Sequence, residues 1–394
     1  MADASPPRPA PDVAATVEGN RLALLPDGPG RLEALLSLID GATESLRILY
    51  YMFLDGESGR RIRDALLAAS ERGVKVWVLV DGFGSETGKS GFFSPLIESQ
   101  VEFRRFSAKF GRRYLLRNHQ KLALADGERV IIGGFNISDD YFGTIEAGAW
   151  RDLGLQVDGP SVRCLAGYFD DLFKWASDPQ GRIRDVRKML QQHSVTSGKM
   201  DWLFGGPTRR LSPWARAVRK DMKAARRLDL VAAYFAPSLG MLRRIAGIAR
   251  RGGKARVVTA AKSDNNATID AARSTYFWLL KRGVEIYEYQ PTKLHTKLFV
   301  VDDVVHIGSA NFDMRSLFLN LEMMLRVEDA AFATAMHRFV DAEIAQSRQI
   351  TPELHRAHRS WINRLRWGFA YFLVAVADYR ISRRLNFGAD GVED

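Results

Sequence analysis

The sequence predicts an α/β fold of two similar fused lobes, each a mixed, largely parallel sheet flanked by helices, with the active site between the lobes. Three observations predict it: the length of 394 residues, the alternation of strand-like and helix-like segments, and an internal repeat. A chain of this length exceeds what one hydrophobic core usually organises, so two units are the default expectation. The repeat indicates that the two units are alike.

Both halves of the chain carry a β-α-β pattern. In the first half, residues 46–53 (LRILYYMF) form an apolar run short enough for a buried strand, residues 59–72 show helical spacing, and residues 74–80 (VKVWVLV) form another apolar run. The second half repeats this order with a strand over 228–235, a helix over 239–251 and a strand over 255–259. Because the elements follow one another in the same order, we interpret the halves as products of a duplication.

One short motif, His-x-Lys with an aspartate five residues after the lysine, occurs twice, 176 residues apart. The two copies are His119-Gln120-Lys121 with Asp126, and His295-Thr296-Lys297 with Asp302. Each copy opens a predicted strand, and side chains alternate between the two faces of a strand, so histidine and lysine share a face. Both can therefore reach one ligand. The aspartates come at the far end of the strand, where we expect them to stabilise turns.

A second pattern follows each motif. A further strand-like segment ends in small residues, and an asparagine follows: Gly133-Gly134 and Asn136 in the first half, Gly308-Ser309 and Asn311 in the second. Small residues allow the backbone and the amide to approach a bound group closely. The asparagines are therefore candidate substrate ligands.

Two histidines paired with lysines predict phosphoryl-transfer chemistry. One imidazole can attack phosphorus and form a covalent phosphohistidine, which splits one difficult displacement into two easier ones. The other imidazole protonates the leaving oxygen and later activates the acceptor alcohol. Five side chains are expected to hold the phosphate oxygens: Lys121, Lys297, Asn136, Asn311 and Ser309. They replace a metal, so we expect no metal and no cofactor.

Two glutamates repeat in step with the motif, since Glu146 lies 27 residues after His119 and Glu322 lies 27 residues after His295. A carboxylate bonded to the remote ring nitrogen fixes the tautomer of a histidine and raises its basicity. The equal spacing predicts that Glu146 orients His119 and that Glu322 orients His295. Exposed glutamates at strand ends are the alternative. The predicted catalytic residues are His119, Lys121, Asn136, Glu146, His295, Lys297, Asn311 and Glu322.

The composition favours a phosphate-rich partner and a reducing compartment. Lys and Arg number 57 against 46 Asp and Glu, a formal net charge of +11. This charge suits anionic lipid or nucleic acid and does not by itself choose between them. Cys164 is the only cysteine of the sequence, which excludes an intrachain disulfide and a cysteine-based zinc site.

The chain divides into four predicted regions: a disordered tail (1–18), a first lobe (19–200), a second lobe (201–350) and a basic, aromatic helical region (351–394). The tail is rich in Pro and Ala and lacks the pattern of a secretory signal. No window reaches the roughly 18–20 apolar residues that a spanning helix requires. We therefore expect neither a signal peptide nor a transmembrane helix.

The C-terminal region is a candidate membrane-interface segment. It combines aromatic side chains (Trp361, Trp367, Phe369, Tyr371, Phe372 and Tyr379) with basic ones (Arg364, Arg366, Arg380, Arg383 and Arg384). Such a helix would lie in the plane of the lipid headgroups, with its arginines near anionic phosphates. A helix packed on a lobe, or a dimer contact, is the alternative.

These motifs resemble the phospholipase D superfamily, whose signature is a duplicated H-x-K-x4-D with a following G-S or G-x-N, and the resemblance spans roughly residues 20–345. Several phrases look like bacterial cardiolipin synthases of the short type that lacks N-terminal transmembrane helices: Tyr50-Tyr51-Met52-Phe53, Asp81-Gly82-Phe83-Gly84-Ser85, Arg117-Asn118-His119, Gly133-Gly134-Phe135-Asn136-Ile137, Trp150-Arg151-Asp152 and Asn311-Phe312-Asp313-Met314-Arg315-Ser316. One departure is Gly134 in place of the serine of the second copy, which makes the half-sites unequal.

The resemblance implies a phosphatidyltransferase that makes cardiolipin from phosphatidylglycerol and a second phospholipid through a phosphatidyl-histidine. It implies His119 as the nucleophile and His295 as the acid. The expected partners are anionic phospholipids, namely phosphatidylglycerol with or without phosphatidylethanolamine, and the expected place is the cytoplasmic face of the cell membrane. Hydrolysis of phospholipids to phosphatidic acid and a metal-independent nuclease are the alternatives. Nucleic acid is the less favoured partner.

Overall fold

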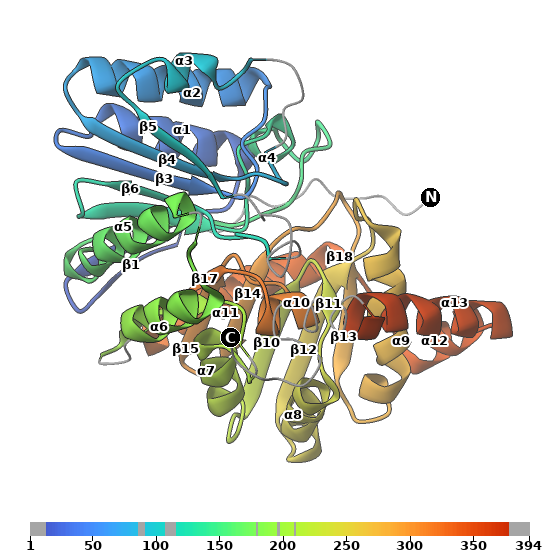
Figure 1. Cartoon of the computed structure of the whole chain (residues 1–394). Coiled ribbons are helices and arrows are strands. Elements are labelled where there is room, and N and C mark those ends of the chain that lie inside the picture. Colours follow the sequence, from blue (N-terminus) through green and yellow to red (C-terminus); the bar gives the residue numbers. More distant parts are fainter. Residues whose placement is uncertain are drawn as a thin grey trace.

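The structure is a computed structural model and describes residues 13–85, 91–106, 116–178, 180–194, 198–208 and 210–377. These residues form two lobes, each with an eight-stranded sheet (Figure 1). Most of the expected disordered tail, residues 1–12, lies outside the described residues. The remainder of the tail prediction is wrong, because Ala14–Val17 forms a strand that pairs antiparallel with the strand after it.

The first lobe holds the strands β1 (Ala14–Val17), β2 (Asn20–Leu25), β3 (Ser45–Tyr50), β4 (Lys75–Asp81), β5 (Glu102–Phe106), β6 (Leu122–Ala125), β7 (Arg129–Gly133) and β8 (Gly154–Asp158). Its helices are α1 (Gly28–Asp40), α2 (Glu57–Glu71), α3 (Ser94–Ile97), α4 (Asp139–Phe142), η1 (Pro160–Val162), α5 (Cys164–Ser177) and α6 (Ile183–His193). The strand order is β1-β2-β8-β7-β6-β3-β4-β5.

The second lobe holds the strands β9 (Met200–Gly205), β10 (Arg227–Ala232), β12 (Lys254–Ala260), β13 (Glu285–Tyr289), β14 (Lys297–Val301), β15 (Val304–Gly308), β17 (Glu322–Glu328) and β18 (Ser347–Gln349). A small pair is formed by β11 (Phe235–Ala236) and β16 (Phe312–Asp313). The helices are α7 (Pro213–Asp221), α8 (Leu239–Arg250), α9 (Asn266–Leu280), α10 (Met314–Phe318), α11 (Ala330–Ala345), α12 (Pro352–His358), α13 (Trp361–Tyr371) and the π-helical η2 (Phe372–Ala377). The strand order is β18-β13-β12-β10-β14-β15-β17-β9.

Seven strands of each sheet follow the same order, and the eighth is added at opposite edges, β1 beside β2 and β18 beside β13. Both predicted β-α-β units are present, as β3-α2-β4 and β10-α8-β12. The mixed character of the sheets is confirmed. The expectation that they are largely parallel is wrong, because only two of the seven strand pairings in each sheet are parallel. The reason is that each histidine motif opens a hairpin, β6-β7 or β14-β15, and a tight hairpin can join only antiparallel strands.

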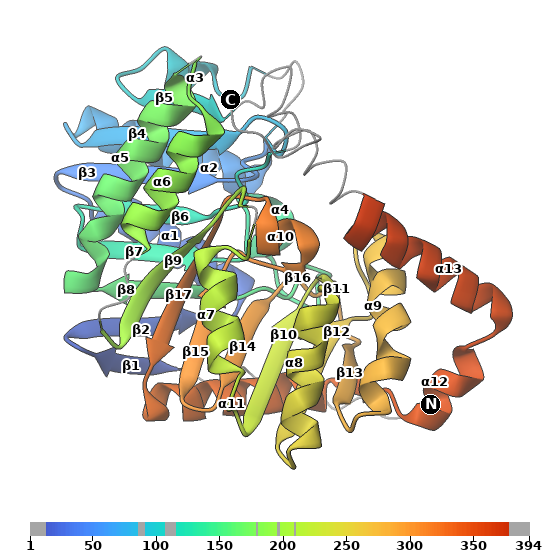
Figure 2. The same ribbon diagram turned by 60° about the horizontal axis from the view of Figure 1, so that its bottom comes forward.

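The helices and sheets stack in layers, because successive side chains of a strand face opposite sides. In β3, Leu46 and Ile48 pack in the cluster with α1 and α2, whereas Leu49 packs in a core shared by both lobes. This shared core also takes α5, α6 and α11. Figure 2 shows α7, α8 and α9 on the outer face of the second sheet. The two sheets are thus joined through one apolar layer.

The motif aspartates close the two hairpins, as the sequence predicts. Asp126 and Asp302 have φ angles of +54° and +50°. The carboxylate of Asp126 accepts backbone N–H groups of Glu44 and Ser45, and that of Asp302 accepts the N–H of Arg227. Asx side chains tolerate left-handed turns and bond to nearby backbone, so these aspartates are structural.

The C-terminal region packs on the second lobe in part. Trp367 of α13 is buried and its ring stacks on His355 with centroids 5.3 Å apart, while Arg366 pairs with Asp270 of α9. The segment after residue 377, including Tyr379, Arg380, Arg383 and Arg384, lies outside the described residues. None of the helices in the described part of the chain is long and apolar enough to cross a membrane.

Candidate active site

The two histidine motifs meet where the lobes join, and each is held by backbone from the opposite lobe. The N–H of His119 donates to the carbonyl of Leu321 at 2.9 Å, and the N–H of His295 donates to the carbonyl of Arg151 at 2.7 Å. His119 lies three residues before the inner strand β6, and His295 lies two residues before β14. The duplication thus places the two histidines in equivalent positions of a single site.

Each imidazole is paired with a carboxylate of the other lobe. Nδ1 of His119 lies 3.2 Å from Oε2 of Glu322, and Nδ1 of His295 lies 2.6 Å from Oδ2 of Asp152. Both carboxylates are fully buried. The pairing predicted from sequence, Glu146 with His119 and Glu322 with His295, does not occur, because Glu146 is exposed in the loop after α4.

Asp152, rather than Glu146, is the counterpart of Glu322. The N–H of Gly134 donates to Leu153, the residue after Asp152, just as the N–H of Ser309 donates to Met323, the residue after Glu322. Equal spacing from the histidines is misleading here, since Asp152 lies 16 positions after Asn136 but Glu322 lies only 11 positions after Asn311. Aligning the two small-residue turns and the strands after them would have found Asp152.

The departure of Gly134 from the second copy also has a geometric reason. A Cβ at Gly134 would lie 2.3 Å from Oδ1 of Asp152, which is far inside van der Waals contact. In the second copy Ser309 donates its hydroxyl to Oε2 of Glu322 at 2.5 Å, and Ser316 donates to Oε1 at 2.7 Å. Ser309 is therefore placed to hold the carboxylate, which differs from the phosphate contact expected from sequence.

The two lysines are buried beside their histidines. Nζ of Lys121 donates to the carbonyl of His119 at 2.5 Å. Nζ of Lys297 donates to the carbonyl of His295 and lies 2.8 Å from its Nδ1. Each lysine is 1% exposed. The two ammonium groups are the cations that the sequence predicts for binding phosphate.

The asparagines are buried as well. Oδ1 of Asn136 accepts the N–H of Met52 at 3.2 Å, and its amide donates to the hydroxyl of Tyr141 at 3.1 Å. Oδ1 of Asn311 has no hydrogen-bond partner among the described residues. Asn136 is thus fixed by contacts within the first lobe.

Burial lowers the pKa values of both histidines and both lysines, with repulsion between their positive charges as a further cause, and favours their neutral forms. Burial, followed by the charge of Lys297, lowers the pKa of His295 to about 4, and burial and Lys121 lower the pKa of His119. Burial lowers the pKa of Lys121 to about 7 and that of Lys297 to about 8.

The two buried carboxyl groups remain ionised. Burial by itself would raise the pKa of Asp152, but Lys297 and His295 hold it below its usual value. In the same way, burial is outweighed at Glu322 by His119 and Lys121. An ionised carboxylate that accepts from Nδ1–H leaves Nε2 of each imidazole to attack or to exchange a proton.

Aromatic rings that the sequence reasoning did not assign surround the imidazoles. The ring of Tyr51 lies 5.0 Å from that of His119, and the rings of Tyr141 and Trp150 lie 5.2 and 5.5 Å from that of His295. The sequence signal for Tyr51 and Trp150 was their place within two of the phrases that resemble cardiolipin synthases. Such walls limit the ring orientations and exclude water.

Buried arginine contacts lock the segment before Asp152 to the second lobe. Arg151 pairs with Glu343 of α11 at 2.5 Å, and both side chains are buried. Among the described residues, no group of three or more His, Cys, Asp or Glu side chains is placed to hold a metal ion.

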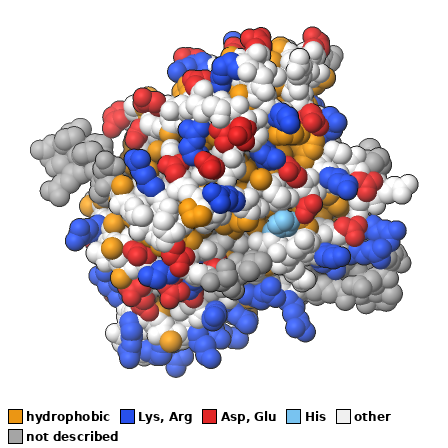
Figure 3. Space-filling view, turned by 90° about the vertical axis from the view of Figure 1, so that its left-hand side faces the viewer, with side chains coloured by type: hydrophobic (Ala, Val, Ile, Leu, Met, Phe, Trp, Pro, Cys, Tyr) orange, Lys and Arg blue, Asp and Glu red, His pale blue; other side chains and the backbone are white. Residues whose placement is uncertain are grey.

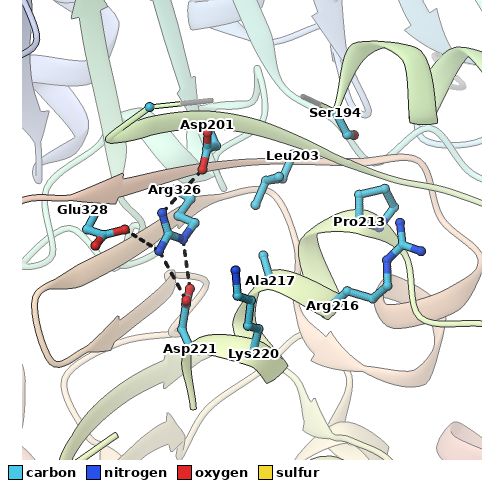
Figure 4. A pocket seen from close by; sticks show the side chains of 11 residues that line it. Ser194, Asp201, Leu203, Pro213, Arg216, Ala217, Lys220, Asp221, Arg326 and Glu328 are labelled. Carbon is cyan, nitrogen blue, oxygen red and sulfur yellow. Dashed lines mark hydrogen bonds and ion pairs between the residues drawn. The ribbon is translucent and has the colours of Figure 1, made fainter. Parts of the chain in front are cut away.

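A separate cavity of about 600 Å³ lies between β9, β17 and α7 and contains neither histidine motif. Figure 4 shows its centre, where Arg326 bonds to Asp201, Asp221 and Glu328. The positive charge of Arg326 is therefore matched by three carboxylates. The described residues that line this cavity include no histidine.

The fold and site define a two-lobed phosphodiester-processing class in which each lobe supplies one histidine and one lysine. The family described as "Cardiolipin synthase, PLD-like domain" matches residues 35–160 and again residues 219–343, so the chain belongs to this family. The repeated match coincides with the two lobes.

Individual proteins that are similar to this chain carry the same family name. The chain is 29% identical over 350 residues to cardiolipin synthase A of Pseudomonas entomophila, covering 86% of this chain and 72% of the relative. It is 29% identical over 364 residues to cardiolipin synthase of Listeria monocytogenes, covering 89% and 74%. The crystal structure of phosphatidylserine synthase from Haemophilus influenzae superposes with a TM-score of 0.73 over 95% of this chain and 97% of that one. At 13% identity, this last likeness concerns the fold alone.

Proposed function

We propose that the protein is a phosphatidyltransferase that makes cardiolipin from phosphatidylglycerol and a second phospholipid. The observation that carries the proposal is the pair of histidine-carboxylate contacts, each formed across the lobes, with a buried lysine beside each histidine. Two bases in one site suit a double displacement. The family match and the names of the relatives support the phosphatidyl group as the group that is transferred.

In the first step the neutral imidazole of His119 attacks phosphorus of phosphatidylglycerol through Nε2. A nitrogen-phosphorus bond forms, the bond to the glycerol oxygen breaks, and protonated His295 gives its proton to that oxygen as glycerol leaves. Glu322 stabilises the charge that develops on His119, since it accepts from Nδ1. The lysines stabilise the negative phosphoryl oxygens.

In the second step the hydroxyl of another phosphatidylglycerol attacks phosphorus while His295 takes its proton. The nitrogen-phosphorus bond breaks, so His119 is regenerated and cardiolipin leaves. Asp152 supports the alternation of His295 between acid and base, because its carboxylate stabilises the imidazolium. A bound phosphodiester adds a negative charge that raises the low pKa of His295 and so favours the acid form.

The proposed substrates are anionic phospholipids, with phosphatidylethanolamine as a further candidate donor. We place the enzyme as a peripheral protein on the cytoplasmic face of the cell membrane. The net charge of +11 supports contact with anionic headgroups.

The proposal is tested by incubating purified protein, in the presence of a chelator, with vesicles of phosphatidylglycerol alone or mixed with phosphatidylethanolamine, followed by mass spectrometry of the lipids. We expect cardiolipin and free glycerol. Phosphatidic acid as the only product would identify a hydrolase. Unchanged lipid together with cleavage of DNA would replace the proposal by a nuclease.

A further inference from the structure

The C-terminal helix α13 and η2 expose a row of large apolar side chains along one side: Trp361, Ile362, Leu365, Phe369, Phe372 and Leu373. We call this row the apolar stripe. Trp361 is 72% exposed and Leu365 is 65% exposed. The stripe holds six of the nine large hydrophobic side chains that are exposed in the described part of the chain. A concentration of this kind marks an interaction surface.

The opposite side of the same helix is fixed to the second lobe, so the stripe has a defined direction. Trp367 is 4% exposed, and the hydroxyl of Tyr371 donates to the carbonyl of Pro237 at 2.8 Å. Ala370 and Ala375 pack against Ala271 of α9. The stripe consequently faces away from the described part of the second lobe.

A positively charged groove lies nearby, between α7 and α8. We call it the arginine groove; its volume is about 530 Å³, and its described lining comprises Leu211, Arg219, Ser238, Gly240, Met241, Arg243, Arg244, Gly247, Arg251 and Phe318. These residues include four arginines and no acidic side chain. Figure 3 shows Lys and Arg gathered along the lower edge of the molecule, where α7 and α8 lie in Figure 1.

The short helix α10 connects the stripe, the groove and the candidate active site. At its start, Met314 packs with Ala370 and Ala375 beside the stripe. At its end, Phe318 lines the arginine groove. Between them, Ser316 donates to Glu322, the carboxylate that contacts His119. Both surface features therefore adjoin the element that supports the catalytic pair.

We propose that the apolar stripe and the arginine groove together form the surface on which the protein sits on an anionic phospholipid bilayer, next to its active site. This inference rests on the proposed function, because a phosphatidyl substrate must pass from the bilayer to the two histidines. The stripe enters the boundary between headgroups and acyl chains, and the arginines contact phosphates. A second copy of the chain is disfavoured as the partner of this surface. A symmetric dimer would bring the arginine grooves of the two copies close together, and their positive charges would repel.

The test is flotation of the full-length protein with vesicles of phosphatidylcholine, alone or mixed with phosphatidylglycerol. Wild type should float with the mixed vesicles. Phe369→Glu should weaken partitioning by about tenfold or more, since it places a charge where an aromatic ring was buried in lipid. Ile97→Glu is the matched control, because Ile97 is 58% exposed on α3 of the other lobe, and it should float as wild type does.

The groove is tested with Arg243→Glu, which should reduce flotation with phosphatidylglycerol vesicles at low salt. Arg338→Glu is its control, since Arg338 is an exposed residue of α11. The buried side of α11 packs in the core shared by both lobes, whereas α8 packs in a separate apolar cluster of the second lobe. Equal loss in both arginine variants would overturn the groove assignment, because it would show an effect of net charge alone.

Failure of this inference differs from failure of the proposed function. We expect Phe369→Glu to keep transfer on short-chain phosphatidylglycerol dispersed as monomers while losing transfer on vesicles. If wild type floats but transfers no phosphatidyl group from either substrate, the proposed function fails and the surface stands. If Phe369→Glu floats like wild type, the surface is wrong.

Two further outcomes would also overturn the surface. In the first, sedimentation velocity shows that wild type is a dimer and that Phe369→Glu is a monomer, while flotation is unchanged. In the second, the flotation of the full-length chain is lost on removal of residues 378–394, which would place the lipid contact outside the stripe and the groove.

Discussion

Nδ1 of His295 lies 2.6 Å from Oδ2 of Asp152, although the two residues belong to opposite lobes and stand 143 positions apart. The equivalent contact joins His119 to Glu322 at 3.2 Å. Each histidine therefore takes its carboxylate partner from the opposite lobe. This exchange of carboxylates ties catalytic geometry to the packing of one lobe on the other.

Replacing Asp152 by Asn should lower kcat by about 100-fold to 10,000-fold, because an amide neither stabilises the imidazolium nor enforces the Nδ1–H tautomer. The folded state should persist, since the two side chains have the same shape. The matched variant is Glu146→Gln, which should keep the wild-type rate because Glu146 is exposed. Steady-state transfer assays with thermal melts compare the two variants, and a slower Glu146→Gln enzyme would contradict this assignment.

His119→Ala and His295→Ala should each abolish turnover, but they should differ in the intermediate. If His119 is the nucleophile, His295→Ala can still form a phosphatidyl adduct with a donor whose leaving group needs no protonation, such as a p-nitrophenyl phosphodiester. Intact-protein mass spectrometry at mildly alkaline pH should detect the adduct in His295→Ala and none in His119→Ala. The reverse pattern would exchange the roles of the histidines.

The rate should fall on the alkaline side as the lysines lose their protons. An ammonium exists below its pKa and disappears above it, and burial lowers the pKa of Lys121 to about 7 and that of Lys297 to about 8. Because kcat/KM reports the free enzyme, in which His295 has a pKa of about 4 and loses its proton first, the loss of the two ammonium groups should steepen its decrease as pH rises through about 7 to 8. The profile of kcat should decrease at higher pH, since bound phosphate favours the ammonium. A kcat/KM that stays flat up to the ordinary lysine pKa would contradict this view.

Sequence reasoning located both histidines and lysines, since their strand periodicity and repetition are local properties. The turn role of Asp126 and Asp302 is confirmed for the same reason. The predicted carboxylate partners of both histidines are wrong, because a contact between lobes is set by tertiary packing, which chain spacing does not record. The longer segment before Asp152 made equal spacing from the histidine misleading.

The direction of the sheet pairings was also missed. Alternating strands and helices predict parallel strands, but the short connection between β6 and β7 leaves no room for a crossover helix. The exposed side of α13 could be found from its aromatic residues, whereas its packed side, with Trp367 against His355, required the structure.

Gly134→Ser, which makes the first copy match the second, should damage the enzyme. A Cβ would lie 2.3 Å from Oδ1 of Asp152, so the carboxylate must move away from His295. We expect kcat to fall by about 10-fold to 100-fold, as for other groups that orient a catalytic ligand. The converse variant, Ser309→Gly, should fall less, because Ser316 still donates to Glu322 at 2.7 Å. Transfer assays on the pair test the order, and equal losses would contradict it.

Glu343→Ala should destabilise the fold and disturb the site together. It leaves the guanidinium of Arg151 buried without its partner, and removal of one member of a buried pair costs about 3–5 kcal/mol. Arg151 directly precedes Asp152 and its carbonyl accepts the N–H of His295, so the loss should also lower kcat in the fraction that remains folded. Asp170→Ala is the control, because Asp170 is half exposed where it pairs with Arg47 and should cost less than about 1 kcal/mol. Urea unfolding gives both values, and similar midpoints for the two variants would show that the contact between Arg151 and Glu343 does not hold the lobes together.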